Sequence, residues 1–188
     1  MIQDYIDYIS LQRKELGGHA ICPFAKSFLN KVQIIESTNF MADAFKCIQN
    51  KEHPMLYLIY GDPKQFDKKW LEEFCNDHQQ FAKIKDLWLI WDHPDQINKI
   101  NGIQTNNNEY AILLIQGLSE LNKYSKRLHK TSYYGFWDKE YYNKIMKDRK
   151  ETEETEETEV IDDLEKYKDL SDDCFEEMLV HKLKKKKS

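Results

Sequence analysis

The chain has 188 residues and a net charge of −5, with 40% hydrophobic and 32% charged residues, which suits one modest core and excludes a membrane protein. Six glycines and four prolines exclude collagen-like and Pro/Gly-rich disordered chains. The lack of an apolar run of about 18 residues and of a signal peptide predicts a soluble, cytoplasmic protein with no membrane partner. Four scattered cysteines without a CxxC pair fit a reducing compartment.

The negative charge belongs to the C-terminal part of the chain. Residues 1–149 hold 20 Lys/Arg against 19 Asp/Glu, whereas residues 150–188 hold 8 against 14. Residues 151–159 form an acidic low-complexity repeat, which repels itself and buries nothing. We therefore expect a single α/β domain over 1–149 and a mostly disordered acidic tail over 150–188. The alternative is that the tail docks onto a partner protein.

Hydrophobic periodicity and turn residues divide residues 1–149 into helices and strands. A first helix is expected from Ile2 to Leu16, closed by Gly17 and Gly18, and a short helical stretch follows Pro23 as far as Leu29. Further helices are expected at 40–49, 66–82 and 118–128, with a last one that ends near 147. Strands are expected at 32–36, 54–60 and 87–91, and a loop at 98–108. Residues 110–115 fit either a fourth strand or the start of a helix, and the strand is favoured.

The order of these elements indicates the class of fold. Residues 54–60 form a nearly continuous apolar run, as expected of a central strand that is buried on both faces. Strands that alternate with helices of ten or more residues are typical of α/β layers. The sequence therefore predicts a three- or four-stranded parallel or mixed sheet that is flanked by helices.

Polar side chains follow two of the predicted strands. In an open α/β sheet, ligands bind outside the carboxyl ends of the parallel strands, which directs attention to Asp62 and to the segment Asp92–Asp95. A helix that starts after Pro23 and leads into the strand at Val32 would begin at that same edge. If the strands are parallel, His19 and Cys22 join these loops in one place.

Cys22 has the surroundings of a reactive thiol. Pro23 suits the first position of a helix, which makes Cys22 the N-cap, where backbone N–H groups and the helix dipole favour a thiolate. Lys26 adds a positive charge one turn later, and His19 supplies a base or a second ligand. Ala25 stands where a dithiol motif has its second cysteine, so a CxxC redox cycle is excluded. The alternative is a buried, inert thiol.

These residues suggest roles in a site, and each has a structural alternative. Cys22 is the candidate nucleophile, with His19 or His93 as base and Asp92 orienting it. The spacing His19-x-x-Cys22 also suits metal ligands, with His93 completing a zinc or iron site, although the sequence requires no cofactor. Alternatively, His93 is a loop histidine and the aspartates are turn formers. Candidate substrate-binding residues are Lys26, Asp62 and Asp95.

A basic segment at 123–130 precedes an aromatic cluster at 133–137 and 141–142. One interpretation is a phosphate or RNA surface with stacking rings, and the other is a solvated helix face followed by rings packed on the sheet. The nearly neutral charge of residues 1–149 argues against a nucleic-acid partner. GxxxxGK[ST], GxGxxG, HExxH and GxSxG motifs are absent from the sequence.

Two short motifs carry a resemblance to a known family. Leu16–Lys26 resembles the Leu-Cys-Pro-Phe-Ala-Lys signature of a small bacterial family of unknown function, with Ile21 in place of the leucine. His93–Asp95 looks like the His-Pro-Asp loop of that family, and Thr131–Tyr134 only echoes its Ser-Pro-Tyr-Pro segment. The resemblance implies that Cys22 and His93–Asp95 belong to one site. The frequent Lys, Asn and Ile residues also suit a viral or other AT-rich genome.

Two functional hypotheses follow from the sequence. The first is a small enzyme that uses Cys22 as thiolate nucleophile or metal ligand on a small molecule or a protein side chain. It predicts a depressed thiol pKa and a pocket that joins Cys22 to His93. The second is a non-catalytic adaptor that binds a partner protein through its tail and the aromatic cluster around Trp137. It predicts an unreactive Cys22 and binding that is lost without residues 150–188.

Overall fold

The computed structural model describes residues 2–50, 54–106 and 109–154, so nearly all of the predicted acidic tail lies outside the described residues. Residues 1–149 form one compact unit, and this unit contains every described strand. None of the helices in the described ranges is both long enough and apolar enough to cross a bilayer.

Four strands form one mixed sheet, which confirms the predicted fold class. Their order across the sheet is β1-β2-β6-β3. β1 and β2 are parallel, and β6 is antiparallel to both β2 and β3, so β1, β2 and β3 all run in the same direction. The run at 54–60 is an inner strand, as predicted. The strands are β1 Val32–Glu36, β2 Leu56–Gly61, β3 Leu87–Asp92 and β6 Ala111–Gly117.

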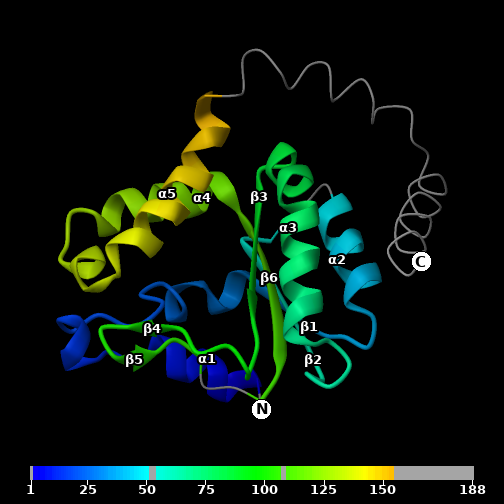
Figure 1. The fold of residues 1–188 in the computed structure, drawn as a ribbon, viewed down its shortest axis with the longest axis horizontal. Helices are drawn as coiled ribbons and strands as arrows, with labels where there is room; N and C mark the ends of the chain where they lie inside the picture. The colour runs from blue at the N-terminus through cyan, green and yellow to red at the C-terminus, as the bar shows by residue number, and fades with distance from the viewer. Residues whose placement is uncertain (1, 51–53, 107–108, 155–188) are drawn as a thin grey trace. The chain divides into compact units, whose positions relative to one another are not determined.

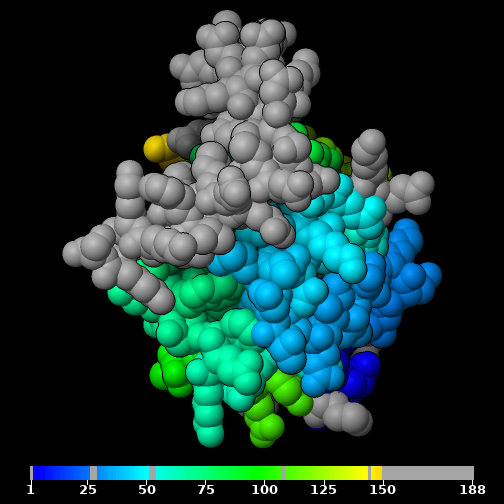
Figure 2. Space-filling view, turned by 90° about the vertical axis from the view of Figure 1, so that its right-hand side faces the viewer, coloured from blue at the N-terminus to red at the C-terminus, as the bar shows by residue number. Residues whose placement is uncertain are grey.

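Helices cover both faces of the sheet (Figure 1). α2 (Phe40–Gln49) and α3 (Lys68–Ile84) lie on one side of it, and the side chains of Asn39 and Asp67 cap their amino termini. Figure 2 shows atoms of these two helices next to one another on that face. The helices on the other side are α1 (Ile2–Ser10), α4 (Leu118–Leu128) and α5 (Lys139–Glu154).

The alternation of side chains along the strands divides the core into two layers. On the α1 side, Leu58 and Ile112 are buried against Tyr5 and Ile6 of the helix. The residues that alternate with them face α2 and α3 and are fully buried, namely Ile59, Ala111, Leu113 and Ile115. Both faces of the inner strands are therefore apolar, which explains why β2 reads as a continuous hydrophobic run.

The first helix is shorter than predicted. α1 ends at Ser10, and a separate 3-10 turn at Lys14–Leu16 is closed by Gly17 in the left-handed conformation. The backbone N–H of Cys22 returns to the carbonyl of Ile9 at 2.8 Å, so the intervening residues form a closed loop. The apolar residues whose spacing suggested one long helix belong to two separate segments, α1 and the 3-10 turn, and each segment buries apolar side chains.

The segment after Cys22 also departs from the prediction. Residues 22–25 form a turn, and a 3-10 helix, η2, runs from Lys26 to Lys31 with Ala25 as its N-cap. Cys22 is therefore not the N-cap of a helix, and the expected support of its thiolate by that position is lost. Pro23 starts the turn instead, because its fixed φ suits the first corner of a turn as well as the start of a helix.

Two further differences lie in the second half of the chain. The predicted loop at 98–108 contains a small hairpin, β4 (Lys99–Ile100) and β5 (Ile103–Gln104), which turns at Gly102 with a positive φ. α5 continues to Glu154, beyond the predicted end near 147 and into the acidic repeat. The helical propensity of Glu outweighs its charge repulsion over the first residues of that repeat.

Candidate functional site

The carboxyl ends of β1, β2 and β3 meet at one edge of the sheet, because these three strands run in the same direction. Asp92 is the last residue of β3 and shares the sheet face of Trp88 and Ile90, which is the face that α1 covers. Its carboxyl therefore points toward α1. Sequence reasoning directed attention to this edge for this reason.

Removal from water makes the Asp92 carboxyl a weaker acid than an ordinary aspartate. Removal from water raises the pKa of its carboxyl to about 7, although hydrogen bonds from the His93 backbone and the Asn106 side chain act in the opposite direction. The His93 N–H donates to Oδ1 at 2.9 Å. Asn106 is fully buried and also donates to the carbonyl of His93 at 2.7 Å. Asp92 thus exchanges protons close to neutral pH.

Tyr5 of α1 lies close to both Asp92 and Cys22. Burial raises the pKa of the Tyr5 phenol well above its ordinary value, and the charges of Asp92 and Cys22 raise it further. Two groups expected at the same edge, Asp92 and Cys22, therefore lie within electrostatic reach of one phenol. The Cys22–Tyr5–Asp92 group is called the polar cluster below.

The Cys22 thiol is not the resting thiolate that the sequence predicts. Burial raises its pKa, and this effect exceeds the opposing hydrogen bonds from the backbone N–H groups of Phe24 and Ala25. Those two N–H groups nevertheless stabilise negative charge on the sulfur once a base removes the proton, although the Ala25 N–H also donates to the carbonyl of Cys22 at 3.1 Å. The other described thiols, Cys47 and Cys75, are buried in α2 and α3, and burial raises the pKa of each.

Tyr133 connects the polar cluster to His19. Its hydroxyl donates to the carbonyl of Ile21 at 2.5 Å, and the charge of Cys22 contributes to the raised pKa of its buried phenol, after burial itself. The His19 ring meets the Tyr133 ring edge to face at 5.7 Å, and its Nε2 lies 3.4 Å from Ser132 Oγ. His19 therefore stands beside the cluster, and its observed side-chain partner is Ser132.

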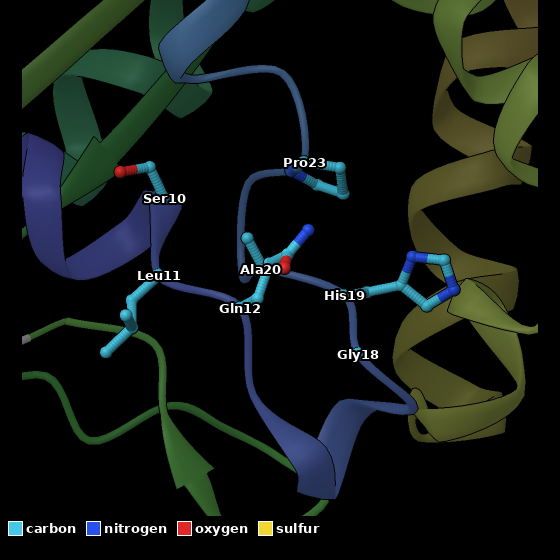
Figure 3. Close-up of a pocket in the computed structure, with 7 residues that line it drawn as sticks. All are labelled: Ser10, Leu11, Gln12, Gly18, His19, Ala20 and Pro23. Carbon is cyan, nitrogen blue, oxygen red and sulfur yellow. The ribbon is translucent and has the colours of Figure 1, made fainter.

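A hollow of about 410 Å³ lies beside the loop that connects Ser10 to Cys22. It is lined by residues 10–12, 18–20 and Pro23, and Figure 3 shows the His19 ring pointing away from Ser10 and Leu11. Pro23 links its wall to the neighbouring Cys22. The residues that line it include neither Cys22 nor His93, so this hollow is not the predicted pocket that joins the two.

The structure gives His93 a different position from the one predicted. The ring is 2% exposed, Nδ1 accepts the N–H of Asp95 at 3.1 Å, and Nε2 lies 3.4 Å from the carbonyl of Pro63. Because backbone groups engage both nitrogens, His93 joins the loops after β2 and β3. This arrangement is the loop histidine of the alternative interpretation.

Two of the remaining candidates, Asp62 and Asp95, have exposed side chains. Asp62 is exposed and accepts the N–H of Lys64 at 2.9 Å, as a turn former does. The side chain of Asp95 is 83% exposed. The backbone of Lys26 begins η2, and the position of its side chain lies outside the description. Among the described residues, no three His, Cys, Asp or Glu side chains gather as metal ligands, so His19, Cys22 and His93 do not form a metal site together.

Sequence reasoning missed several members of the site. Tyr5 shows itself only as an apolar position of an amphipathic helix, and Asn106 stands in a run of asparagines that reads as loop. Tyr133 was placed in an aromatic cluster without any link to Cys22. The tyrosines and Asn106 come from segments that are distant along the chain, so only the folded chain shows them together.

The chain matches none of the known protein families, curated proteins or solved structures with which it was compared.

Proposed function

We propose that the protein is a small enzyme that acts on a small molecule or a protein side chain, with Cys22 as nucleophile and Asp92 as the group that moves the proton. The observation that carries the proposal is the half-buried carboxyl of Asp92, with a pKa of about 7, in the same cluster as the thiol. A general base is most effective when its pKa lies near the working pH. The family resemblance of the Cys22 segment names no activity and stays a prediction.

The chemistry follows from the states of the two groups. Above pH 7 the Asp92 carboxylate takes the proton of the neutral Cys22 thiol, and the Tyr5 phenol lies within electrostatic reach of both groups. The sulfur then forms a bond to an electrophilic carbon of the substrate while the bond to the leaving group breaks. Backbone N–H groups of Phe24 and Ala25 stabilise the sulfur anion. Asp92 returns the proton to the leaving group.

Alkylation of Cys22 by iodoacetamide, measured by mass spectrometry from pH 5 to pH 10, tests this role. We expect the rate to rise through an inflection near pH 7 and the inflection to disappear in Asp92→Asn. Asp95→Asn is the matched control, because that carboxylate is exposed and three residues away. An identical inflection in wild type and Asp92→Asn would show that Asp92 does not serve Cys22.

An adaptor function is the second candidate, and it is favoured by the surface at the start of α5. Tyr141 is 48% exposed and stacks on Trp137 with ring centroids 5.6 Å apart. An exposed aromatic ring that packs on a half-buried one is a common anchor in protein interfaces. Affinity capture with the full chain, with Trp137→Ala and with a chain that ends at Glu154 tests it. A partner that binds all three equally well would contradict the adaptor proposal.

A further inference from the structure

The two edges of the sheet differ in what covers them. Along β3, the N–H of Leu89 donates to the side chain of Gln79 in α3 at 3.3 Å. Lys83 of the same helix has its Nζ 5.4 Å from the centre of the Trp88 ring, and this Nζ donates to the carbonyl of Asp148 in α5 at 2.7 Å. Side chains of α3 therefore occupy the β3 edge. β1 is the strand at the opposite edge of the sheet.

One hydrogen bond fixes which backbone groups of β1 point outward. Ser37 follows β1, and its N–H donates to the carbonyl of Tyr60 in β2 at 2.8 Å. In a parallel pair, residues that bond to the neighbouring strand alternate with residues whose N–H and C=O point away from it. Ile35 therefore bonds to β2 as Ser37 does, whereas Ile34 and Glu36 direct their backbone groups to the outer edge. Among the described residues, none hydrogen-bonds the N–H or the C=O of Ile34.

The side chain at the middle of this edge is apolar and exposed. Ile34 is 42% exposed, although Leu58, which lies in register with it on β2, is buried on the α1 side of the sheet. Natural edge strands are commonly protected from pairing by a proline, a bulge or an inward-pointing charge. Val32–Glu36 has a regular register and no proline, and its one charged residue, Glu36, stands at its end. The β1 edge is therefore open to an added strand.

We infer that two copies of this chain associate through β1, by antiparallel pairing of the two β1 strands about a two-fold axis at Ile34. This register pairs Ile34 with its own counterpart and Val32 with Glu36, so every outward-facing residue of β1 meets an outward-facing residue. Each such pair exchanges two hydrogen bonds. The two four-stranded sheets then form one continuous sheet across a self-complementary interface.

Two observations favour a second copy as the occupant of this edge. The exposed Ile34 side chain lies at the two-fold axis, where it meets an identical apolar side chain and covers it from water. Lys31 precedes β1 and Glu36 ends it, and both are exposed. Antiparallel pairing brings the cationic end of each strand to the anionic end of the other, whereas parallel pairing would place like charges together. None of these residues belongs to the polar cluster, so the inference does not depend on the proposed function.

Sedimentation equilibrium of the full chain, over about a hundredfold range of concentration, tests the inference. We expect the mean mass to rise from that of one chain toward that of two. Ile34→Pro removes an N–H that the β1–β2 pairing does not use, and edge strands tolerate proline at such positions. It should weaken dimerisation at least about tenfold, because both hydrogen bonds at the axis are lost. Ile34→Val is the matched control, because it keeps the N–H and a β-branched apolar side chain, and it should dimerise like the wild type.

Amide hydrogen exchange of the wild-type chain, followed by NMR, tests the same pairing without a substitution. Exchange of the Ile34 N–H should slow about tenfold between the lowest and the highest concentration, as the dimer forms. The Ile35 N–H is the internal control, because it bonds to β2 and should be protected at both concentrations.

Three results would overturn the inference. The mass of one chain at every concentration would show that no second copy binds. Dimerisation of Ile34→Pro as strong as that of the wild type would place the contact on another surface. An Ile34 N–H that is protected in the monomer would show that the chain covers this edge itself. Exchange of the buried β6 amides checks that Ile34→Pro is folded, and if it is not, the wild-type exchange decides.

Discussion

Asp92 links the acidity of one side chain to the stability of the fold. Burial raises its pKa to about 7 in the folded protein, whereas an exposed carboxyl in the unfolded chain titrates near its ordinary value of 3.8. Between these values the folded state binds the proton more tightly than the unfolded state. The free energy of unfolding therefore falls as the pH rises through this window, and above pH 7 the loss is complete.

Asp92→Asn should remove this loss. We expect the substitution to stabilise the protein at pH 8 by up to about 4 kcal/mol, since each pKa unit corresponds to about 1.36 kcal/mol. The asparagine oxygen still accepts the His93 N–H, so the loop should be kept. Urea unfolding of both proteins at pH 5 and at pH 8 measures the effect. A wild-type and variant difference that is the same at the two pH values would contradict it.

Alanine substitutions at the two glycines before His19 distinguish the cost of backbone strain from the cost of a steric clash. Gly17 and Gly18 both have positive φ, but a Cβ at Gly17 would lie 2.9 Å from the Phe136 ring, whereas a Cβ at Gly18 meets nothing within 4 Å. Gly18→Ala should cost about 1–2 kcal/mol of stability from conformation alone. Gly17→Ala should cost about 1–3 kcal/mol more because the ring must move. Thermal unfolding compares the two, and equal losses would show that Phe136 yields freely.

At the scale of elements, Asp86 connects α3, β3 and α4. It adopts a positive φ of 55° in the turn between α3 and β3, and its carboxylate accepts the N–H and the hydroxyl of Ser119 at 2.9 and 2.7 Å. Its carbonyl accepts the N–H of Leu118 at 2.8 Å. One turn residue thus caps the helix that follows β6, which has no side-chain cap from its own N-cap residue Gly117.

Asp86→Ala should destabilise the protein by about 1–2 kcal/mol through loss of this cap, with some further cost from the left-handed backbone. Asp86→Asn is the control, because asparagine caps helices and tolerates positive φ. Chemical denaturation gives the difference in the free energy of unfolding. If alanine and asparagine behave alike, the side chain of Asp86 does not stabilise α4.

The elements that sequence reasoning located best are those whose own pattern specifies them. β1 and α2 have the predicted bounds, and β2, β3 and β6 differ from prediction by one or two residues, because apolar runs and turn residues define them locally. The antiparallel insertion of β6 between β2 and β3 has no local signature. The helix expected over 2–16 ends at Ser10 in the structure, and residues 11–16 were included in it because their apolar residues continue a near-helical spacing.

The candidate site was also predictable from the sequence only in part. Parallel strands ending at one edge indicated Asp92 and Cys22, and both do lie near Tyr5. Of the two alternatives for Cys22, burial favours the neutral thiol over the thiolate, because a turn replaces the expected helix and burial raises the thiol pKa. The role of His93 depended on which backbone groups surround its ring. That environment comes from the loop after β2, thirty residues away along the chain.

At the scale of the whole molecule, the described core lies entirely within residues 1–149. A chain that ends at Glu154 should therefore keep the melting temperature of the full protein and the pH profile of Cys22 alkylation. A chain that ends at Asp138 lacks α5 and should melt several degrees lower, because Trp88 and Lys83 lose their partners. Calorimetry of the three chains decides. Equal melting of all three would show that α5 contributes no stability.

The position of β6 also sets the order in which the protein can fold during synthesis. In the described sheet, β3 hydrogen-bonds to no strand except β6, and β2 has one edge that only β6 fills. A nascent chain that has emerged as far as residue 106 therefore carries an unpaired β3 and an open β2 edge. The free backbone groups of these edges can pair with other chains, which promotes aggregation. Both edges close together when residues 111–117 leave the ribosome. Chaperones that bind exposed strands have their main opportunity in the interval between β3 and β6.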